Sequence, residues 1–592
     1  MYKNILSNHI KFNDDFTVLA PLFNTGGGNN IEHDREDSQS HPEVVATSNA
    51  KSLYTGNGND TIVGTANALA SSNAIARSET TSISEHRFLG SAISQSDTVI
   101  EALAIGIDNT GKIIMDRGCD KVVGVANVSA TAISEASSQA KLVFDNVSDV
   151  ETNAQSEATA NILAQGVGIS NTGRIHTGQG RDKIIGIANI SATATSSAFS
   201  KGKSVVDRNS VAIANGESVS VVEGLAIGID NSNKIDTGSD HDVIIGVANT
   251  ATMTEADAVA FTYSVATLSS ELDSDAVDFG TAISQSTSEA IADSFTTTLG
   301  IVNSGKIFAG KGNDIIFGLA NNRSVSNSEA ISEAVATAND FADAVGIANS
   351  LAIANGNAVG IANLGKIDTG EGNDTIIGVA VNDSAANAEA DADAEAFAND
   401  SDSSVDTNAI ADTFEAIAIG IDNADGLIET GHGNDRVVGY GEIGIIGGKI
   451  TTGKGHDRVI GYGTTVGVEG GNIRLGDGND YFKADVVDFD LFTGKVWQRS
   501  DRSSSIKDAE VFGGHGNDTF ELGGFEGTVS IDGGKHHDVL KLWGSVDDYN
   551  FTLGSSGNQL TIKNSDSELV VKDVEELYFG NSDRAYSFND FA

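Results

Sequence analysis

The sequence predicts an all-β protein built as a solenoid, a stack of small coils from which long strand-like arms project. Three observations predict this fold class. A glycine–aspartate motif recurs along the chain, the segments between the motifs alternate small residues with a period of two, and only 2 of the 592 residues are proline. Proline cannot donate a backbone hydrogen bond, so its near absence suits a chain whose N–H groups are almost all used between strands.

The motif reads Gly-x-Gly-x-Asp and is followed by a short apolar stretch. Residues 55–64 read Thr-Gly-Asn-Gly-Asn-Asp-Thr-Ile-Val-Gly, and residues 369–378 repeat them almost unchanged. The aspartates of the series are Asp60, Asp120, Asp182, Asp242, Asp314, Asp374, Asp435, Asp457, Asp480, Asp518 and Asp538. Their successive spacings are 60, 62, 60, 72, 60, 61, 22, 23, 38 and 20 residues. Such a series indicates an internal repeat, which is typical of stacked architectures.

The short spacings explain the long ones. In residues 440–461, a glycine turn precedes the motif and a short apolar strand follows it. The long units contain the same pieces and add one insert, for example between Asn127 and Asn171. We therefore expect one small coil per motif, with an arm added at one fixed corner of the long units.

The repeat divides the chain into four parts. Residues 1–50 precede the motifs and are expected to be disordered or poorly structured, whereas residues 51–440 carry the long units of the solenoid. Residues 441–530 carry short coils, and residues 531–592 are expected to form a capping module at the C-terminus. The arm after Asn249 is 72 − 60 = 12 residues longer than its neighbours and is expected to bulge.

The arms alternate small residues with period two. Every even position of residues 388–398 is alanine, and every even position of residues 324–338 is alanine or serine. Period two places these residues on one face of a strand. An alanine-rich helix is the alternative because alanine is a strong helix former, but strict alternation favours strands. Faces of such small residues would let two sheets of arms pack unusually close.

Asparagines also recur in register along the repeat. They stand after the apolar strands, at Asn67, Asn127, Asn189, Asn249 and Asn321, and in the turns, at Asn109, Asn171, Asn231, Asn303 and Asn363. Ladders of side-chain amides between stacked coils explain this register better than contacts with a ligand.

The motif has the chemistry of a calcium loop. Its glycines permit a positive φ and a tight turn that brings carbonyl oxygens inward, and its aspartate adds a carboxylate. Ca²⁺ takes six to eight oxygen ligands, so one loop offers too few, whereas two loops on consecutive coils complete the shell. A glycine-turned solenoid with aspartate ladders and no metal is the alternative. The predicted site residues for several Ca²⁺ ions are Gly56, Gly58, Asp60, Gly178, Gly180, Asp182, Gly310, Gly312, Asp314, Gly370, Gly372, Asp374, Gly431, Gly433, Asp435, Gly453, Gly455, Asp457, Gly476, Gly478, Asp480, Gly514, Gly516 and Asp518.

These loops resemble the nonapeptide repeats of RTX, or haemolysin-type calcium-binding, proteins, whose Gly-Gly-x-Gly-x-Asp-x-apolar-x pattern builds a parallel β-helix that binds Ca²⁺. Residues 531–542 and 574–579 are similar to the terminal module of many such proteins. The resemblance implies a parallel β-helix or β-roll, and export by type I secretion through an uncleaved C-terminal signal, which residues 589–592 resemble.

The sequence departs from the family pattern in three ways. Most coils carry a single motif, and threonine commonly stands where the family has its first glycine. The loop of Asp120 lacks a glycine, and Asp240 and His536 replace glycine in two others. We therefore give the loops of Asp120, Asp242 and Asp538 less weight as calcium sites.

Charge and composition indicate which classes of partner the chain can bind. Lys and Arg number 36 against 83 Asp and Glu, and the net charge of −47 argues against nucleic acid and points to cations. The N-terminus lacks the order of a signal peptide, and no stretch reaches the roughly 20 apolar residues of a membrane span. With secretion implied by the family resemblance, we expect an extracellular or cell-surface location, with calcium ions and cell-surface or extracellular matrix components as partners.

The predicted role is that of an extracellular structural or adhesive protein. We find no Gly-x-Ser-x-Gly elbow, no His-Glu-x-x-His motif and no phosphate loop, which favours a protein that is not an enzyme. An extracellular enzyme that modifies polysaccharide on a solenoid scaffold is the alternative, because paired acids on the coil surface would suffice for such chemistry.

Overall fold

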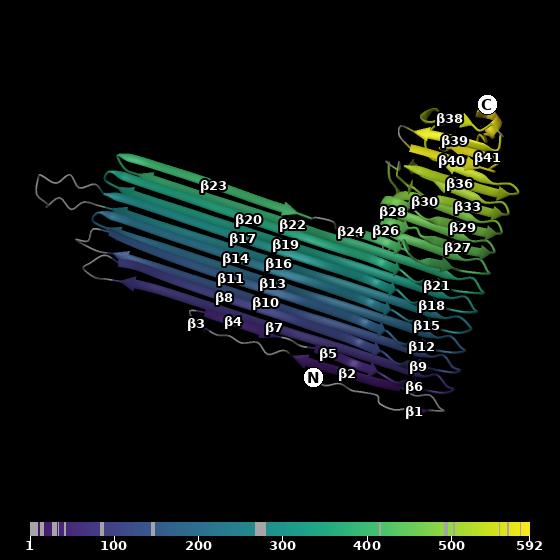
Figure 1. Ribbon diagram of the computed structural model, residues 1–592, viewed down its shortest axis with the longest axis horizontal. Coiled ribbons are helices and arrows are strands. Elements are labelled where there is room, and N and C mark those ends of the chain that lie inside the picture. Colours follow the sequence, from purple (N-terminus) through teal and green to yellow (C-terminus); the bar gives the residue numbers. More distant parts are fainter. Residues whose placement is uncertain are drawn as a thin grey trace, which may run out of the picture.

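Three positions in each coil carry apolar side chains that stack into three columns, as seen in a computed structural model of the chain. In one coil these residues are Ile175, Ile184 and Ile229, all fully buried against their counterparts in neighbouring coils. A single coil cannot bury these side chains alone, so the coils must stack. The result is a parallel β-solenoid, which confirms the predicted all-β fold class (Figure 1).

The structure describes most of the chain. The described residues are 10–11, 17–25, 32–33, 35–40, 43–82, 88–143, 149–266, 280–413, 416–490, 495–500, 502, 504–555, 557–564, 567–580 and 582–591.

Each long coil consists of a short strand, the glycine loop, an outgoing arm strand and a returning arm strand. The short strands are β6 (Ser52–Tyr54), β9 (Lys112–Ile114), β12 (Arg174–His176), β15 (Lys234–Asp236), β18 (Lys306–Phe308) and β21 (Lys366–Asp368). The outgoing strands are β7 (Thr61–Ser82), β10 (Lys121–Val143), β13 (Lys183–Val206), β16 (Val243–Ala266), β19 (Ile315–Ala338) and β22 (Thr375–Phe397). The returning strands are β8 (Phe88–Asn109), β11 (Asp149–Asn171), β14 (Asn209–Asn231), β17 (Thr281–Asn303), β20 (Phe341–Asn363) and β23 (Asp400–Asp412) with β24 (Ile417–Asp422).

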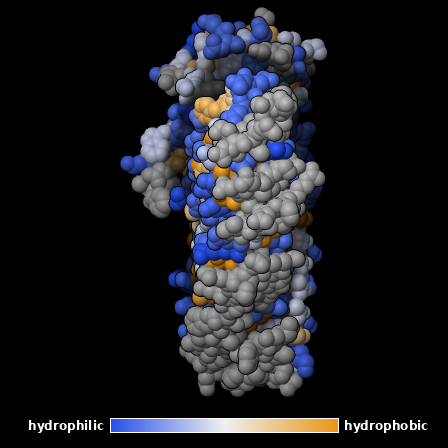
Figure 2. Space-filling view, turned by 90° about the vertical axis from the view of Figure 1, so that its left-hand side faces the viewer, coloured by the Kyte–Doolittle hydropathy of each residue, from blue (hydrophilic) through white to orange (hydrophobic). Residues whose placement is uncertain are grey.

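The arms are continuous strands that extend the coils, as the period of two predicts, and not helices or separate hairpins. Each pairs in parallel with the same strand of the next coil, so that Lys121 of β10 pairs with Lys183 of β13 and Val143 with Val205. Figure 1 shows the arms as a broad stack on one side of the coils. Seen from the arm tips, the molecule is narrow and elongated along the stack (Figure 2).

The two layers of arms face each other through alanine and serine. Serine hydroxyls reach the backbone of the opposite layer: Ser200 Oγ donates to the carbonyl oxygen of Ala154 at 2.9 Å, and Ser332 Oγ to that of Ser286 at 2.8 Å. A side chain this short bridges two sheets only when they are close, so the predicted close packing is confirmed.

Asparagine ladders run along the stack, as predicted. In the turns, the Nδ2 group of each asparagine donates to Oδ1 of the next at 2.6 to 2.8 Å, from Asn49 to Asn423 without a break. A second ladder joins Asn67, Asn127, Asn189 and Asn249. Asn321 continues that register, but the neighbouring Asn322 makes the amide bond, to Asn382.

Short coils continue the stack beyond the arms. Their strands are β25 (Leu427–Glu429), β26 (Arg436–Ile446), β27 (Lys449–Lys454), β28 (Arg458–Glu469), β29 (Asn472–Asp477), β30 (Tyr481–Asp490), β32 (Ile506–Lys507), β33 (Glu510–His515), β34 (Thr519–Leu522), β35 (Phe525–Glu526), β36 (Thr528–Lys535), β37 (Val539–Leu542) and β41 (Glu576–Phe579). Strand β31 (Lys495–Gln498) folds back on β30 as an antiparallel hairpin.

The C-terminal end of the stack is closed by an antiparallel cap. Strands β38 (Asn550–Leu553), β39 (Gln559–Asn564) and β40 (Ser567–Lys572) form it, together with two 3₁₀ turns, Val546–Asp548 and Phe588–Phe591. Phe551, Phe579, Tyr586 and Phe591 pack on one another there. Among the described residues, no helix has the length and apolarity that crossing a membrane requires.

The N-terminal segment differs from the expectation of poor structure in the parts that are described. Strands β1 (Ile10–Lys11), β2 (Thr17–Thr25), β3 (Glu32–His33), β4 (Arg35–Ser40) and β5 (Glu43–Asn49) pair in parallel with the first long coil. Apart from Ala50, the other residues of 1–50 lie outside the described residues, as do residues 267–279, where the longer arm is predicted to bulge, and Ala592 of the signal-like ending.

Candidate metal-binding loops

The glycine loops lie one above another along the stack because each joins a short strand to an outgoing strand at the same corner of every coil. Each third loop residue forms a parallel bridge with the same residue of the next coil, from Asn57 with Arg117 to His432 with Lys454. The structure therefore brings the predicted site residues into one column, with the three loops of lower weight in the same series.

In the loops that carry both glycines, both adopt backbone angles that favour glycine. In one loop, φ is 94° at Gly370 and 141° at Gly372. The second glycine also lies against its neighbour, since a Cβ on Gly372 would overlap the carbonyl oxygen of Gly312 in the preceding coil. The two replacements also take positive φ values, 84° at Asp240 and 91° at His536, which are smaller than the 141° of Gly372.

The loop aspartates form a continuous ladder. Oδ1 of each aspartate from Asp120 through Asp538 accepts the backbone N–H of the aspartate one coil earlier, at 2.7 to 2.9 Å, and the N–H of Asp60 is the first donor. One oxygen of each of these carboxylates is thus engaged in holding two coils together.

Glu575 ends this ladder, and sequence reasoning missed it. Its Oε2 accepts the N–H of Asp538 at 2.7 Å. No glycine motif precedes it, so the motif search passes over it. The register of β37 with β41 is the signal that finds it, because Val539 pairs with Glu576 and Glu575 therefore follows Asp538 in the column.

The second carboxylate oxygen is buried and has no hydrogen-bond donor in most loops. This holds for Oδ2 of Asp182, Asp242, Asp314, Asp374, Asp435, Asp457, Asp480, Asp518 and Asp538. The threonine that opens several loops does not supply a donor, since the Thr177 hydroxyl donates to the Thr237 carbonyl at 3.1 Å. Burying an ionised oxygen without a partner is costly, so this column calls for a proton or a cation.

Burial raises the pKa of these aspartates above the ordinary carboxyl value, against the opposing effect of the N–H group that each Oδ1 accepts. For Asp242, the charges of Asp182 and Asp314 raise the pKa further. The pKa is raised to about 8 for Asp242, to about 7 for Asp314, Asp435 and Asp518, and to about 6 for Asp182, Asp480 and Asp538. It is also raised for Asp374 and Asp457.

The donor set fits a hard cation. No group of three or more His, Cys, Asp or Glu side chains that could hold a metal occurs in the described part of the chain, so carboxylates alone cannot form a site. Loop carbonyl groups supply further oxygens: in the described loops, no backbone N–H donates to the carbonyl oxygen of Gly312 or Gly372. Carboxylate and carbonyl oxygens are the ligands that Ca²⁺ prefers, so the kinds of donor present fit calcium.

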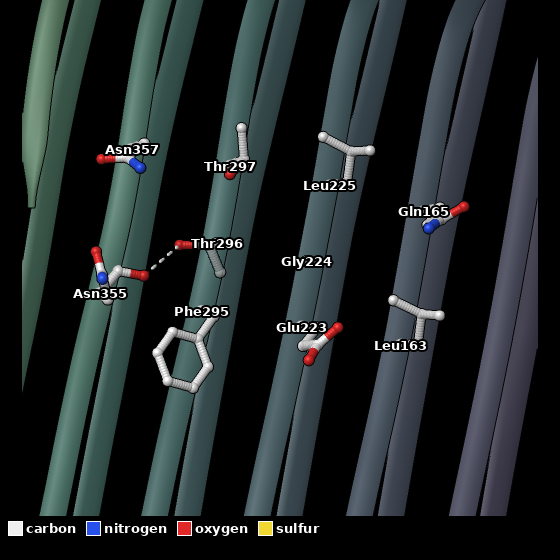
Figure 3. Close-up of a pocket in the computed structure, with 10 residues that line it drawn as sticks. All are labelled: Leu163, Gln165, Glu223, Gly224, Leu225, Phe295, Thr296, Thr297, Asn355 and Asn357. Atoms are coloured by element: carbon white, nitrogen blue, oxygen red, sulfur yellow. Dashed lines mark hydrogen bonds between the residues drawn. The ribbon is translucent and has the colours of Figure 1, made fainter.

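A groove on the outer face of the returning arms is a separate feature (Figure 3). It has a volume of about 430 Å³ and crosses four strands, with Leu163, Leu225 and Phe295 as its apolar residues. Among its described lining residues, Glu223 is the one carboxylate. Acid-catalysed cleavage of a glycosidic bond ordinarily uses two carboxylates, so this groove gives no support to the polysaccharide-modifying alternative.

In comparisons with known proteins, no protein-family model and no curated protein matches the chain.

Proposed function

We propose that the chain is a secreted calcium-binding β-solenoid that serves as an extracellular structural or adhesive protein. The observation that supports calcium most directly is the column of buried Oδ2 atoms without hydrogen-bond donors. These oxygens belong to loops whose sequence resembles the RTX repeat. Members of that family are exported from the cell, which supports secretion.

In this proposal, Ca²⁺ supplies positive charge between consecutive loops. The aspartate Oδ2 atoms, such as those of Asp314 and Asp374, and the loop carbonyl groups hold it, while Oδ1 stays on the backbone N–H of the preceding coil. Each site needs two stacked loops and so exists only in the folded chain. Binding and folding are therefore coupled. The ions also offset part of the net charge of −47.

The structural or adhesive role is supported by the regularity of the fold. Six long arms in register offer extended flat faces, which suit contact with cell-surface or matrix components better than enclosure of a small substrate.

The first test is a calcium titration of the full chain followed by far-UV circular dichroism and calorimetry. We expect loss of β signal in chelator and its return with Ca²⁺. A β spectrum that is unchanged in chelator, with no heat of calcium binding, would overturn the proposal in favour of the metal-free solenoid.

A single substitution separates metal binding from strand pairing. In Asp374→Asn, the side-chain oxygen still accepts the N–H of Asp314, and the new amide replaces the unpartnered Oδ2. We expect fewer bound Ca²⁺ ions per chain and a smaller gain in stability from low to saturating calcium than in the wild type. The control is Asp406→Asn, an exposed residue on β23, which is expected to leave calcium binding unchanged.

A further inference from the structure

The outer face of the outgoing arms carries two opposite charge clusters near the arm tips. We call this surface the distal face; it consists of the outward residues Phe199, Lys201 and Lys203 of β13, Val259, Phe261 and Tyr263 of β16, Ile331, Glu333 and Val335 of β19, and Asp391, Asp393 and Glu395 of β22. Strand register places Lys201, Phe261, Glu333 and Asp393 in one row across the strands.

Both clusters bring like charges together. Lys141 of β10 pairs with Lys203 of β13, and Glu333 of β19 pairs with Asp393 of β22. Like charges directly opposite on neighbouring strands are destabilising. Within the described chain no ion pair is found for Lys141, Lys201 or Lys203, nor for Asp391, Asp393 or Glu395. These charges thus lack compensation inside one molecule.

Apolar and aromatic side chains separate the clusters. Tyr263 is 41% exposed, and the Lys203 ammonium lies 4.9 Å from the centre of its ring. A shallow groove of about 410 Å³ runs between Lys203, Phe261, Tyr263 and Val335. An aromatic centre flanked by charges of both signs has the composition of a protein–protein interface.

We propose that two copies of the chain pack distal face against distal face, about a two-fold axis that runs parallel to the strands between β16 and β19. Such an axis sets β13 opposite the partner's β22, so that Lys201 meets the partner's Asp393 and Lys203 meets the partner's Glu395. Strand β16 then faces the partner's β19, with Tyr263 against the partner's Val335. The symmetry makes every contact twice, as an isologous interface requires.

The size of the distal face sets the strength of this dimer. Toward the coils, the contact is expected to end before the row of Asp257 and Glu329. The two-fold axis would place Asp257 against the same row of the partner's β19, where both facing side chains are carboxylates. Four strands about 4.8 Å apart, over about eight residues with a rise of about 3.3 Å, give about 500 Å² per chain. A total near 1,000 Å² is the lower end of specific interfaces, so we expect a dimer of micromolar affinity that weakens with salt.

Sedimentation velocity of the full chain in calcium-containing buffer tests the proposal. We expect dimers at about 100 μM that dissociate in about 0.5 M salt. The variants Lys201→Glu/Lys203→Glu and Asp393→Lys/Glu395→Lys should each raise the dissociation constant at least about tenfold. The combined fourfold variant restores the charge pairs and should restore the dimer. Circular dichroism of each variant checks that the fold is kept, independently of assembly.

The control is Lys112→Glu/Lys449→Glu, which changes the net charge equally on exposed lysines of β9 and β27 and should leave the dimer intact. A wild-type chain that stays monomeric overturns the proposal, as does a fourfold variant that assembles no better than the double variants. If the Lys201→Glu/Lys203→Glu variant instead keeps its mass and loses retention on an anionic polysaccharide column, the lysines serve a ligand and the dimer is wrong.

Discussion

At the scale of single residues, the second loop glycine is required by the neighbouring coil as well as by its own turn. Gly372 has a φ of 141°, which side-chain-bearing residues rarely adopt, and its Cα faces the carbonyl oxygen of Gly312 without room for a Cβ. Asp240 and His536 show that a side chain can be accommodated at this position at φ values near 90°. The steric demand therefore depends on the φ of each loop.

Gly372→Ala is expected to destabilise the calcium-loaded chain by more than about 3 kcal/mol, since it combines an unfavourable φ with a clash against backbone. Urea unfolding measures the change. Gly166→Ala is the matched control: a Cβ there would meet side chains at 3.6 to 3.7 Å, which is ordinary contact, and we expect a change within about 1 kcal/mol. Equal effects of the two substitutions would contradict the steric account.

A second residue-scale feature is the half-buried ion pair of Glu521. Its Oε1 lies 2.6 Å from the Lys483 ammonium, and its Oε2 accepts the Tyr481 hydroxyl at 2.9 Å. Burial acts to raise the pKa of Glu521, but the hydrogen bond and charge of Lys483 and the Tyr481 hydroxyl outweigh it, so the pKa is lowered. The pair therefore contributes stability above the unfolded carboxyl pKa of about 4.3, and loses it as pH falls through the folded value.

Glu521→Gln should cost about 2 kcal/mol at pH 7, because it leaves the Lys483 ammonium without its closest carboxylate. The difference from the wild type should shrink as pH falls below the unfolded carboxyl pKa of about 4.3, because protonation then increasingly favours the unfolded chain of the wild type. Unfolding of both chains at pH 7 and near pH 3.5 measures this. Glu510→Gln, at an exposed position, provides a control expected to stay within about 0.5 kcal/mol at both pH values. A difference that is constant with pH would rule out the ion pair as its source.

At the scale of elements, the turns between returning strands and short strands are held by the asparagine ladder. Asn231 is fully buried, accepts from Asn171 at 2.7 Å and donates to Asn303 at 2.7 Å and to the Lys306 carbonyl oxygen at 3.2 Å. Each rung thus belongs to two coils at once, and its loss leaves unsatisfied groups on both sides.

Asn231→Ala should lower the free energy of unfolding by about 2 to 4 kcal/mol, because it removes hydrogen bonds and leaves the buried Asn303 oxygen without a donor. Urea unfolding in saturating calcium measures the loss. In the same turn, Asn233 makes one exposed bond, to the Thr172 carbonyl oxygen at 3.1 Å, so Asn233→Ala is expected to cost less than about 1 kcal/mol. Small and similar losses in the free energy of unfolding for the two substitutions would contradict a stabilising role of the ladder.

At the scale of the whole molecule, what repeats in the sequence could be predicted from it. The period of the motif gives the coils, the alternation of alanine and serine gives the arms, and the recurrent asparagines give the turn ladder. Stacking repeats also place the loop aspartates in one column. The sequence does not reveal which oxygen of Asp374 faces the backbone and which lacks a donor, because that depends on the backbone geometry of two coils together.

Features that occur once were not predictable in this way. Glu575 replaces an aspartate without a motif, and β38 and β39 turn the parallel stack into an antiparallel cap at a place where the repeat has ended. The strands of residues 1–50 carry no glycine motif either, so nothing in the pattern distinguishes them from an unstructured leader. Ends of a solenoid are atypical because they must cover exposed edges, and period-based reasoning is weakest there.

The C-terminal cap makes one prediction for the whole molecule, since it covers the last coil of a stack that could otherwise accept another. Removing residues 544–592 leaves β36 without β40 and β37 without β41. Open parallel edges and an uncovered core should drive assembly into particles larger than those of the full chain, as light scattering in calcium would show. In the truncated chain, Thr528→Lys/Ser530→Lys puts charges on the exposed side of β36 and should suppress this assembly, because edge lysines oppose strand pairing. A truncated chain that keeps the mass distribution of the full chain would mean that the cap has no role in ending the stack.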